Sequence, residues 1–206
     1  MYPQTPNTRL LLLLGAVALV LTSWGCGGQR MGAEALPPLP LGVTAEVSEL
    51  PYMVTGTTVP EIRMSLRTAA VGALDGSAVD FHRPRLNLDF RYGLQGVYCE
   101  MTWVAMELES VVEVPQWTER EAADSTLVAM WDTYITALHG HEDTHREYLY
   151  RQARDISREL YRIKSPTCAT VQQMANSTAT GINDWYWELN ERFDEENRII
   201  PWPPTE

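Results

Sequence analysis

Alternating apolar and polar residues predict strands in the first half of the chain. Residues 43–56 mix β-branched and polar side chains and end at a glycine. Residues 86–92 alternate strictly, the pattern of a half-buried strand. Residues 97–114 continue the pattern after a glycine-rich turn that ends at Gly96, and Pro115 is expected to end this strand. Two such strands joined by a short turn predict an antiparallel hairpin.

A helical period of three to four residues takes over in the second half of the chain. The capping box at residues 118–121 is expected to open a helix that runs to Lys164, with only Gly140 as a weak helix former inside it. After a turn at residues 165–167, a second long helix is predicted from residue 168 to about 197. Two long helices joined by a short loop form an antiparallel hairpin.

A shorter helix is expected between the first two strands. Thr58 and Glu61 form its capping box, and its apolar residues are Ile62, Met64 and Leu66. Together these patterns predict an α+β fold in which a small antiparallel sheet packs with a long antiparallel helical hairpin. We expect the domain to cover residues 43–200 and a short tail to cover residues 201–206.

The first residues of the chain have the pattern of an export signal. An apolar run at residues 10–21 follows a single positive charge and is too short to span a membrane. The small residues around Cys26 resemble a bacterial lipoprotein cleavage box, so we expect a signal peptide over residues 1–25 and a lipid on Cys26. An ordinary signal peptide cut near Gly25 is the alternative. Residues 26–42 are rich in proline and are expected to form the lipidated N-terminus and tether.

Composition narrows the partners and the compartment. The 206 residues include 27 acidic and 16 basic side chains, a formal net charge of −11. Such a surface repels phosphate backbones, which argues against a nucleic-acid partner. Besides Cys26 the chain has two cysteines, Cys99 and Cys168. An even pair in an exported chain predicts a disulfide, and two buried thiols are the other interpretation.

The segment His141–His145 contains the candidate chemistry, because it reads H-E-x-x-H. Residues four apart lie on one face of a helix, so His141 and His145 can both bind one Zn²⁺. Glu142 can take a proton from zinc-bound water and return it to a leaving amine. The two histidines fall in a gap of the apolar stripe of this helix, so they are expected to face inward. That stripe consists of Trp131, Tyr134, Leu138, Leu149, Ala153, Ile156 and Leu160.

A catalytic zinc needs one more protein ligand, and the sequence leaves two candidates for it. His139 lies about 200° around the helix from the first motif histidine and is expected at the surface. No histidine follows His145, so a carboxylate of the second helix is the alternative. Glu196 shares the apolar face of that helix and Asp194 does not, yet antiparallel register places residues 186–190 opposite the motif. That apolar face consists of Val171, Ala175, Ile182, Trp185, Leu189 and Phe193.

The order of motifs resembles the bacterial family called domain of unknown function 922, whose members are described as predicted secreted zinc-dependent proteases. The resemblance covers residues 45–197 and implies a zincin-like α+β domain. The family tail reads Tyr-Asp-x-x-Thr-x-His-Gly, whereas residues 195–200 here lack the Thr, His and Gly. The matching motifs are Tyr52–Thr58, Glu61-Ile62-Arg63, Tyr92, Cys99, Val114-Pro115-x-Trp117, His141-Glu142-x-x-His145, Cys168 and Phe193-Asp194-x-Glu196.

Two functions are compatible with this sequence. The first is a zinc-dependent peptidase of the cell envelope, with one zinc on His141 and His145, Glu142 as general base and acid, and a peptide or protein as substrate. The second is a non-catalytic envelope lipoprotein with a structural or degenerate metal site, or with two plain core histidines. Glu142 favours the first and the missing tail histidine favours the second. In both cases we expect an exported lipoprotein of the periplasm or outer membrane that meets the membrane through its lipid anchor only.

Overall fold

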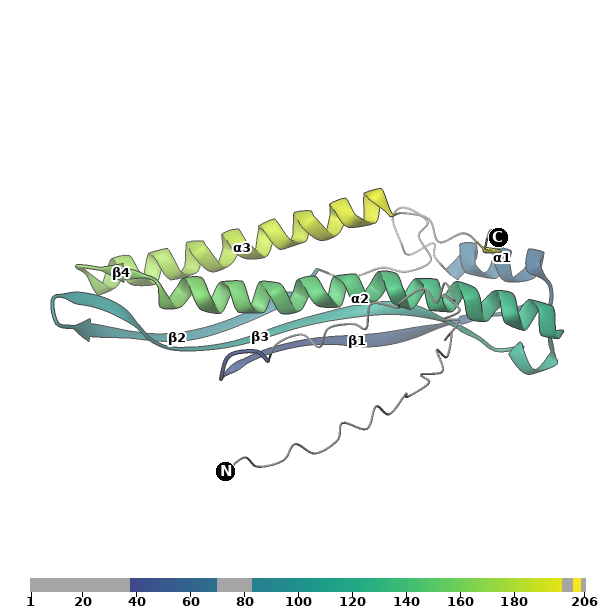
Figure 1. The fold of residues 1–206 in the computed structure, drawn as a ribbon, viewed down its shortest axis with the longest axis horizontal. Coiled ribbons are helices and arrows are strands. Elements are labelled where there is room, and N and C mark those ends of the chain that lie inside the picture. Colours follow the sequence, from purple (N-terminus) through teal and green to yellow (C-terminus); the bar gives the residue numbers. More distant parts are fainter. Residues whose placement is uncertain (1–37, 70–82, 198–201, 205–206) are drawn as a thin grey trace, which may run out of the picture. The chain divides into compact units, whose positions relative to one another are not determined.

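The computed structural model of the chain describes residues 38–69, 83–197 and 202–204. These residues form an α+β unit of three α-helices and a four-stranded mixed sheet (Figure 1). Helix α2 packs on β1 and β3, while α3 packs on β2 and β3. The elements are β1 (Val43–Val54), α1 (Val59–Ala69), β2 (Arg85–Gln95), β3 (Tyr98–Trp117), the 3₁₀ turn η2 (Arg120–Ala122), α2 (Ser125–Tyr161), β4 (Lys164–Ser165) and α3 (Cys168–Glu196).

Strand β3 organises the sheet, because every other strand pairs with it. Strand β2 runs antiparallel along its first half, which confirms the predicted hairpin. Strand β1 runs parallel along its second half, from Val43 opposite Met106 to Val54 opposite Trp117. The prediction of a purely antiparallel sheet was therefore wrong. The long connection from β1 to β3 leaves room for the crossover that a parallel pair needs, and the alternation of side chains contains no information on strand direction.

Two local predictions in the hairpin need correction. The turn lies at Gly96 and Val97, where a positive φ of 66° at the glycine alone fits a two-residue II′ turn. Pro115 does not end β3, which continues to Trp117. Along β3, the pairing with β2 ends at Glu109. Beyond that point one edge of β3 has no strand beside it among the described residues, so a proline without an N–H is tolerated there.

The short helix α1 begins as predicted, but α2 does not. The Thr58 hydroxyl accepts the N–H of Glu61 at 3.4 Å. Of the three apolar residues expected to pack, Ile62 and Leu66 are buried and Met64 is 64% exposed. Helix α2 begins at Ser125 and not at the capping box of 118–121. Asp124 caps it, accepting the N–H groups of Thr126 at 2.9 Å and Leu127 at 3.0 Å, because a carboxylate at this position satisfies donors that the first turn leaves free.

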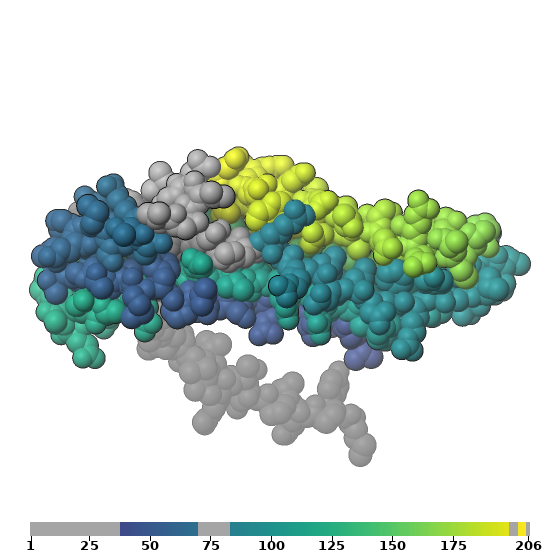
Figure 2. All heavy atoms as spheres, turned by 180° about the vertical axis from the view of Figure 1, so that it is seen from behind, coloured from purple at the N-terminus to yellow at the C-terminus, as the bar shows by residue number. Residues whose placement is uncertain are grey.

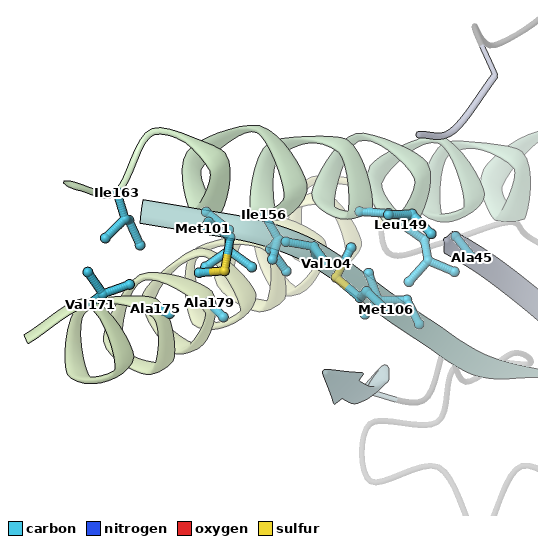
Figure 3. Close-up of a cluster of buried hydrophobic side chains, with 14 of the residues drawn as sticks. Ala45, Met101, Val104, Met106, Leu149, Ile156, Ile163, Val171, Ala175 and Ala179 are labelled. Atoms are coloured by element: carbon cyan, nitrogen blue, oxygen red, sulfur yellow. The ribbon is translucent and has the colours of Figure 1, made fainter. Parts of the chain in front are cut away.

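Two apolar clusters divide the core. The larger one joins β1, β3, α2 and α3, and Figure 3 shows Met101, Val104 and Met106 of β3 between the two helices, with Ile156 of α2 on one side and Ala179 of α3 on the other. Small residues on α3, including Ala175 and Ala179, allow close packing there. The second cluster lies near α1 and the start of α2. Its buried members are Val54, Ile62, Leu66, Trp117, Leu127, Trp131 and Tyr134.

Some sequence-based expectations lie outside the described residues. They include the signal peptide over residues 1–25, the lipid on Cys26 and most of the tether at 26–42. Within the described ranges, no helix is both long and apolar enough to cross a bilayer.

The predicted disulfide is present and joins the sheet to α3. Cys99 of β3 and Cys168 at the start of α3 are bonded, with Cα atoms 5.1 Å apart and a sequence separation of 69. Strand β4 reinforces the same junction, because Ser165 pairs with Cys99. The bond therefore connects the two halves of the chain where β3 begins.

We expect loss of this disulfide to lower the free energy of unfolding by about 4 kcal/mol, since the unfolded chain gains the freedom of a long loop. Urea unfolding of the oxidised protein and of a Cys99→Ser/Cys168→Ser variant measures the difference. A reductant should destabilise the wild type and leave the variant unchanged. Equal stability of oxidised wild type and variant would contradict the assignment.

Candidate metal centre

The motif residues occupy the middle of α2, where its buried stripe turns polar. Glu142 is 3% exposed and His145 1% exposed, and both continue the stripe between Leu138 and Leu149. The His141 side chain lies at the edge of the stripe, 16% exposed. His145 therefore fills the stripe gap as expected, and Glu142 fills the rest of it in place of His141, whose ring lies at the edge and faces Asp194 of α3. His139 is exposed, as predicted.

Polar pairs set the register between α2 and α3. His141 contacts Asp194, His145 contacts Asn190 at 2.6 Å, and the Gln152 amide donates to Asn183 at 2.8 Å. Steps of four and seven residues forward on α2 match equal steps backward on α3, which is the signature of antiparallel packing. This register brings the last turn of α3 against the motif.

Three ligand atoms converge at this point. The Nε2 atom of His145 lies 2.9 Å from Oδ1 of Asp194, and Nε2 of His141 lies 3.0 Å from the same oxygen. The two Nε2 atoms are 3.1 Å apart. Four ligands held at about 2.0–2.1 Å by a tetrahedral zinc lie roughly 3.3 Å from one another. The three atoms thus need to move only a few tenths of an ångström to hold a zinc-sized cation.

Asn190 determines which nitrogen of His145 faces this cluster. Its side-chain NH₂ donates to the carbonyl oxygen of Tyr186 at 2.7 Å, so its own oxygen must point at His145. That oxygen can only accept, so Nδ1 of His145 carries the proton and donates to it. In the neutral ring, Nε2 is then a lone-pair acceptor directed at the carboxylate oxygen of Asp194. Two acceptors in contact repel each other unless a proton or a metal cation lies between them.

The pKa values in the cluster reflect the same demand for positive charge. Burial lowers the pKa of His145, but the hydrogen bond and charge of Asp194 outweigh it and the net shift is upward. Burial alone would raise the pKa of Asp194. The two histidines outweigh this effect and lower the pKa of Asp194 to about 2. Asp194 is therefore an anion in the site, as a metal-binding carboxylate must be.

Glu142 differs from the three converging residues. Burial, only partly offset by the two histidines, raises the pKa of its carboxyl to about 7. Its Oε2 atom is buried without a hydrogen-bond partner among the described residues. A general base performs best when its pKa lies near the working pH, so this environment suits proton transfer.

The cluster is walled on one side and open on another. The Phe193 ring centroid lies 4.7 Å from that of His141 and 5.2 Å from that of His145. The Asp194 side chain is 42% exposed, which leaves access from solvent. A catalytic metal site requires such an open position, whereas a structural site is closed by four protein ligands.

Sequence reasoning left the third ligand open between Glu196 and Asp194, and it put Asp194 off the inner face of α3. Glu196 is exposed, and Asp194 lies at the histidines. The buried positions of α3 follow steps of four, four, seven and four, so the inner face passes through Tyr186 and Asn190 and leaves Trp185 54% exposed. The error came from following apolar residues, because on this helix polar residues are buried where α2 offers polar partners. The buried positions are Val171, Ala175, Ala179, Tyr186 and Asn190.

Comparison with known proteins gives one match. A family model described as "Bacterial protein of unknown function (DUF922)" matches residues 50–199. This range contains the disulfide, the motif helix and Asp194. No curated protein and no solved structure matches the chain significantly.

We expect Asn190→Leu to weaken binding of a divalent metal 10–100-fold, because the variant removes the acceptor that keeps the proton on Nδ1 of His145. The buried N–H loses its acceptor as well, which should lower the free energy of unfolding by about 1–3 kcal/mol. Asn190→Asp retains the oxygen and is the matched control. Metal titration against a competing chelator and nitrogen-15 NMR of the His145 ring provide the readouts. Unchanged metal affinity and tautomer in Asn190→Leu would contradict the positioning role.

Proposed function

The chain belongs to the bacterial protein family of unknown function DUF922, and we propose that it acts there as a zinc-dependent peptidase of the cell envelope. The observation that carries the proposal is the convergence of His141, His145 and Asp194 on one point, with ligand atoms within 4.8 Å of one another. Two imidazoles and one carboxylate are a donor set that zinc takes in catalytic sites.

Each residue has a distinct task in this proposal. His141, His145 and Asp194 hold the ion, and Asn190 orients His145. When bound, zinc supplies Lewis acidity that activates water and polarises a carbonyl group. Glu142 takes the proton of the attacking water and returns it to the departing amine, which is the role its raised pKa supports.

The setting of the protein is part of the proposal. The apolar run before Cys26 and the paired cysteines favour an exported chain held by a lipid on Cys26, in the periplasm or at the outer membrane. A substrate peptide or protein would then be met in the envelope. The open side of the cluster at Asp194 gives such a chain a route to the reacting residues.

A non-catalytic lipoprotein is the second candidate. The absence of the family's tail histidine favours it. In that case the cluster would bind a metal without turnover, or a proton on the His145 ring would replace the cation. Measuring the metal content shows whether a cation or a proton occupies the cluster. Substituting Glu142 shows whether a bound metal takes part in turnover.

We expect about one zinc per chain in the purified full-length protein, measured by inductively coupled plasma mass spectrometry. His141→Ala and Asp194→Ala should lose it, because two remaining ligands hold zinc weakly. Asp143→Ala is the matched control, since this motif residue is exposed and outside the cluster. Wild-type protein without metal, or zinc that persists in both ligand variants, would exclude the proposed site.

Glu142→Gln should keep zinc and lose about 10²–10⁴ in peptide cleavage rate, because the amide cannot accept the proton. Its stability should be equal or higher, since a neutral side chain costs less to bury than a carboxylate. Cleavage of a mixed peptide library, followed by mass spectrometry, measures the rate. A zinc-loaded wild type without cleavage would favour the non-catalytic candidate, and equal cleavage by both proteins would refute the role of Glu142.

A further inference from the structure

The end of the domain formed by the β2–β3 turn and the α2–α3 connection has few acidic residues, and its two glutamates, Glu100 and Glu159, are paired with basic side chains. Neither the stretch 92–99 nor the stretch 160–182 contains a single Asp or Glu, although the chain has 27 of them. The two stretches are neighbours in space, because Cys99 is bonded to Cys168 and paired with Ser165. Figure 2 shows this end with the teal hairpin beside the light-green start of α3. The charge of the protein is therefore distributed unevenly.

The tip of the hairpin is apolar and exposed to solvent. Leu94 is 68% exposed, Val97 78% and Tyr98 47%. The base of the tip is held in place, because Cys99 is bonded to Cys168 and pairs with Ser165 of β4. Apolar side chains presented on a rigid base, without a covering element among the described residues, indicate a surface that meets another phase or partner.

Basic side chains lie directly behind the tip. Arg162 and Lys164 have side chains 67% and 59% exposed. Each makes an exposed ion pair, with Glu159 and Glu100 respectively, and such pairs exchange readily for other anions. Both also line a shallow groove of about 560 Å³, together with Glu159 and the apolar side chains of Ile163, Met174 and Ile182.

We infer that this end, which we call the hairpin end (residues 92–99 and 160–168), docks on the surface of a phospholipid bilayer with anionic headgroups. An aliphatic tip with a tyrosine suits the boundary between headgroups and acyl chains. Lysine and arginine behind it attract anionic lipid, while the acidic remainder of the domain is repelled from the membrane. A protein partner would be expected to carry charged groups that need complementary charges on this surface, and the tip has no charged side chain.

The length of chain before the domain is compatible with this contact. From Cys26 to Leu39 there are 13 residues, which span at most about 43–47 Å when extended. Strand β1 joins β3 at Met106, eight residues or roughly 26 Å from Tyr98 at the tip. A chain anchored at Cys26 can therefore reach the membrane with its hairpin end.

The docking surface is separate from the metal centre. Along α3, the 22 residues from Cys168 to Asn190 amount to about 33 Å. The inference therefore goes beyond the proposed peptidase activity and does not depend on zinc. Docking would hold the metal centre away from the bilayer, towards material in the aqueous envelope.

The test places a fluorophore at the tip of the full-length chain in vesicles. Val97→Cys introduces a thiol at an exposed turn position, whereas Cys99 and Cys168 are bonded to each other. The thiol is labelled with an environment-sensitive probe, and the unsubstituted chain gives the background. Trp185→Cys, exposed on the acidic part of α3, is the matched control. Vesicles contain phosphatidylethanolamine and phosphatidylglycerol, with or without acyl-brominated lipid.

We expect brominated lipid to quench the label at 97 severalfold more than the label at 185. Arg162→Gln/Lys164→Gln should reduce this quenching, and so should replacement of the anionic lipid by phosphatidylcholine. Equal, weak quenching at both positions would overturn the inference. Emission at 97 that changes with protein concentration in detergent, without an effect of brominated lipid, would also overturn it and would assign the tip to contact between copies. Zinc content reports separately on the metal centre.

Discussion

The register between α2 and α3 is the constraint on which the candidate site depends. His145, Asn190 and Tyr186 form a continuous buried chain of hydrogen bonds across the two helices. Shifting α3 by one residue would turn Asn190 and Asp194 about 100° away from α2. It would leave buried polar atoms without partners, which costs more than the net value of the bonds themselves. Register and site are thus determined by the same contacts.

Buried polar groups make this helix pair selective at some cost in stability. Glu142, His145, Gln152 and Asn190 all lie in the interface and are nearly inaccessible to solvent. An entirely apolar interface would bury the same area at a lower cost in free energy, but the two helices could then pack in several registers. The disulfide and β4 compensate at the far end of the pair, since they tie the start of α3 to β3. The domain therefore joins a firmly tied end to an end that carries reactive groups.

Sequence periodicity was sufficient for the elements and insufficient for their mutual placement. The hairpin, the inward stripe of α2 and the disulfide follow from local pattern and cysteine count. The parallel pairing of β1 could not, because alternation is the same in both strand directions. Asp194 was placed off the inner face because hydrophobicity defined that face. Where two helices form polar pairs with each other, buried residues need not be hydrophobic. Only the helix register then shows which polar residues are buried.

The missing tail histidine is weaker evidence against a catalytic metal site once Asp194 is seen to lie beside the two histidines. Two histidines and one carboxylate already supply the three protein ligands that a catalytic zinc needs, and a fourth would close the open position. Asn197, where the family has threonine, donates its side-chain N–H to the Phe193 carbonyl at 2.9 Å and ends α3 directly after Asp194. The divergent tail thus still terminates the helix that presents the third ligand. The number of ligands that could hold the metal therefore does not depend on the tail histidine.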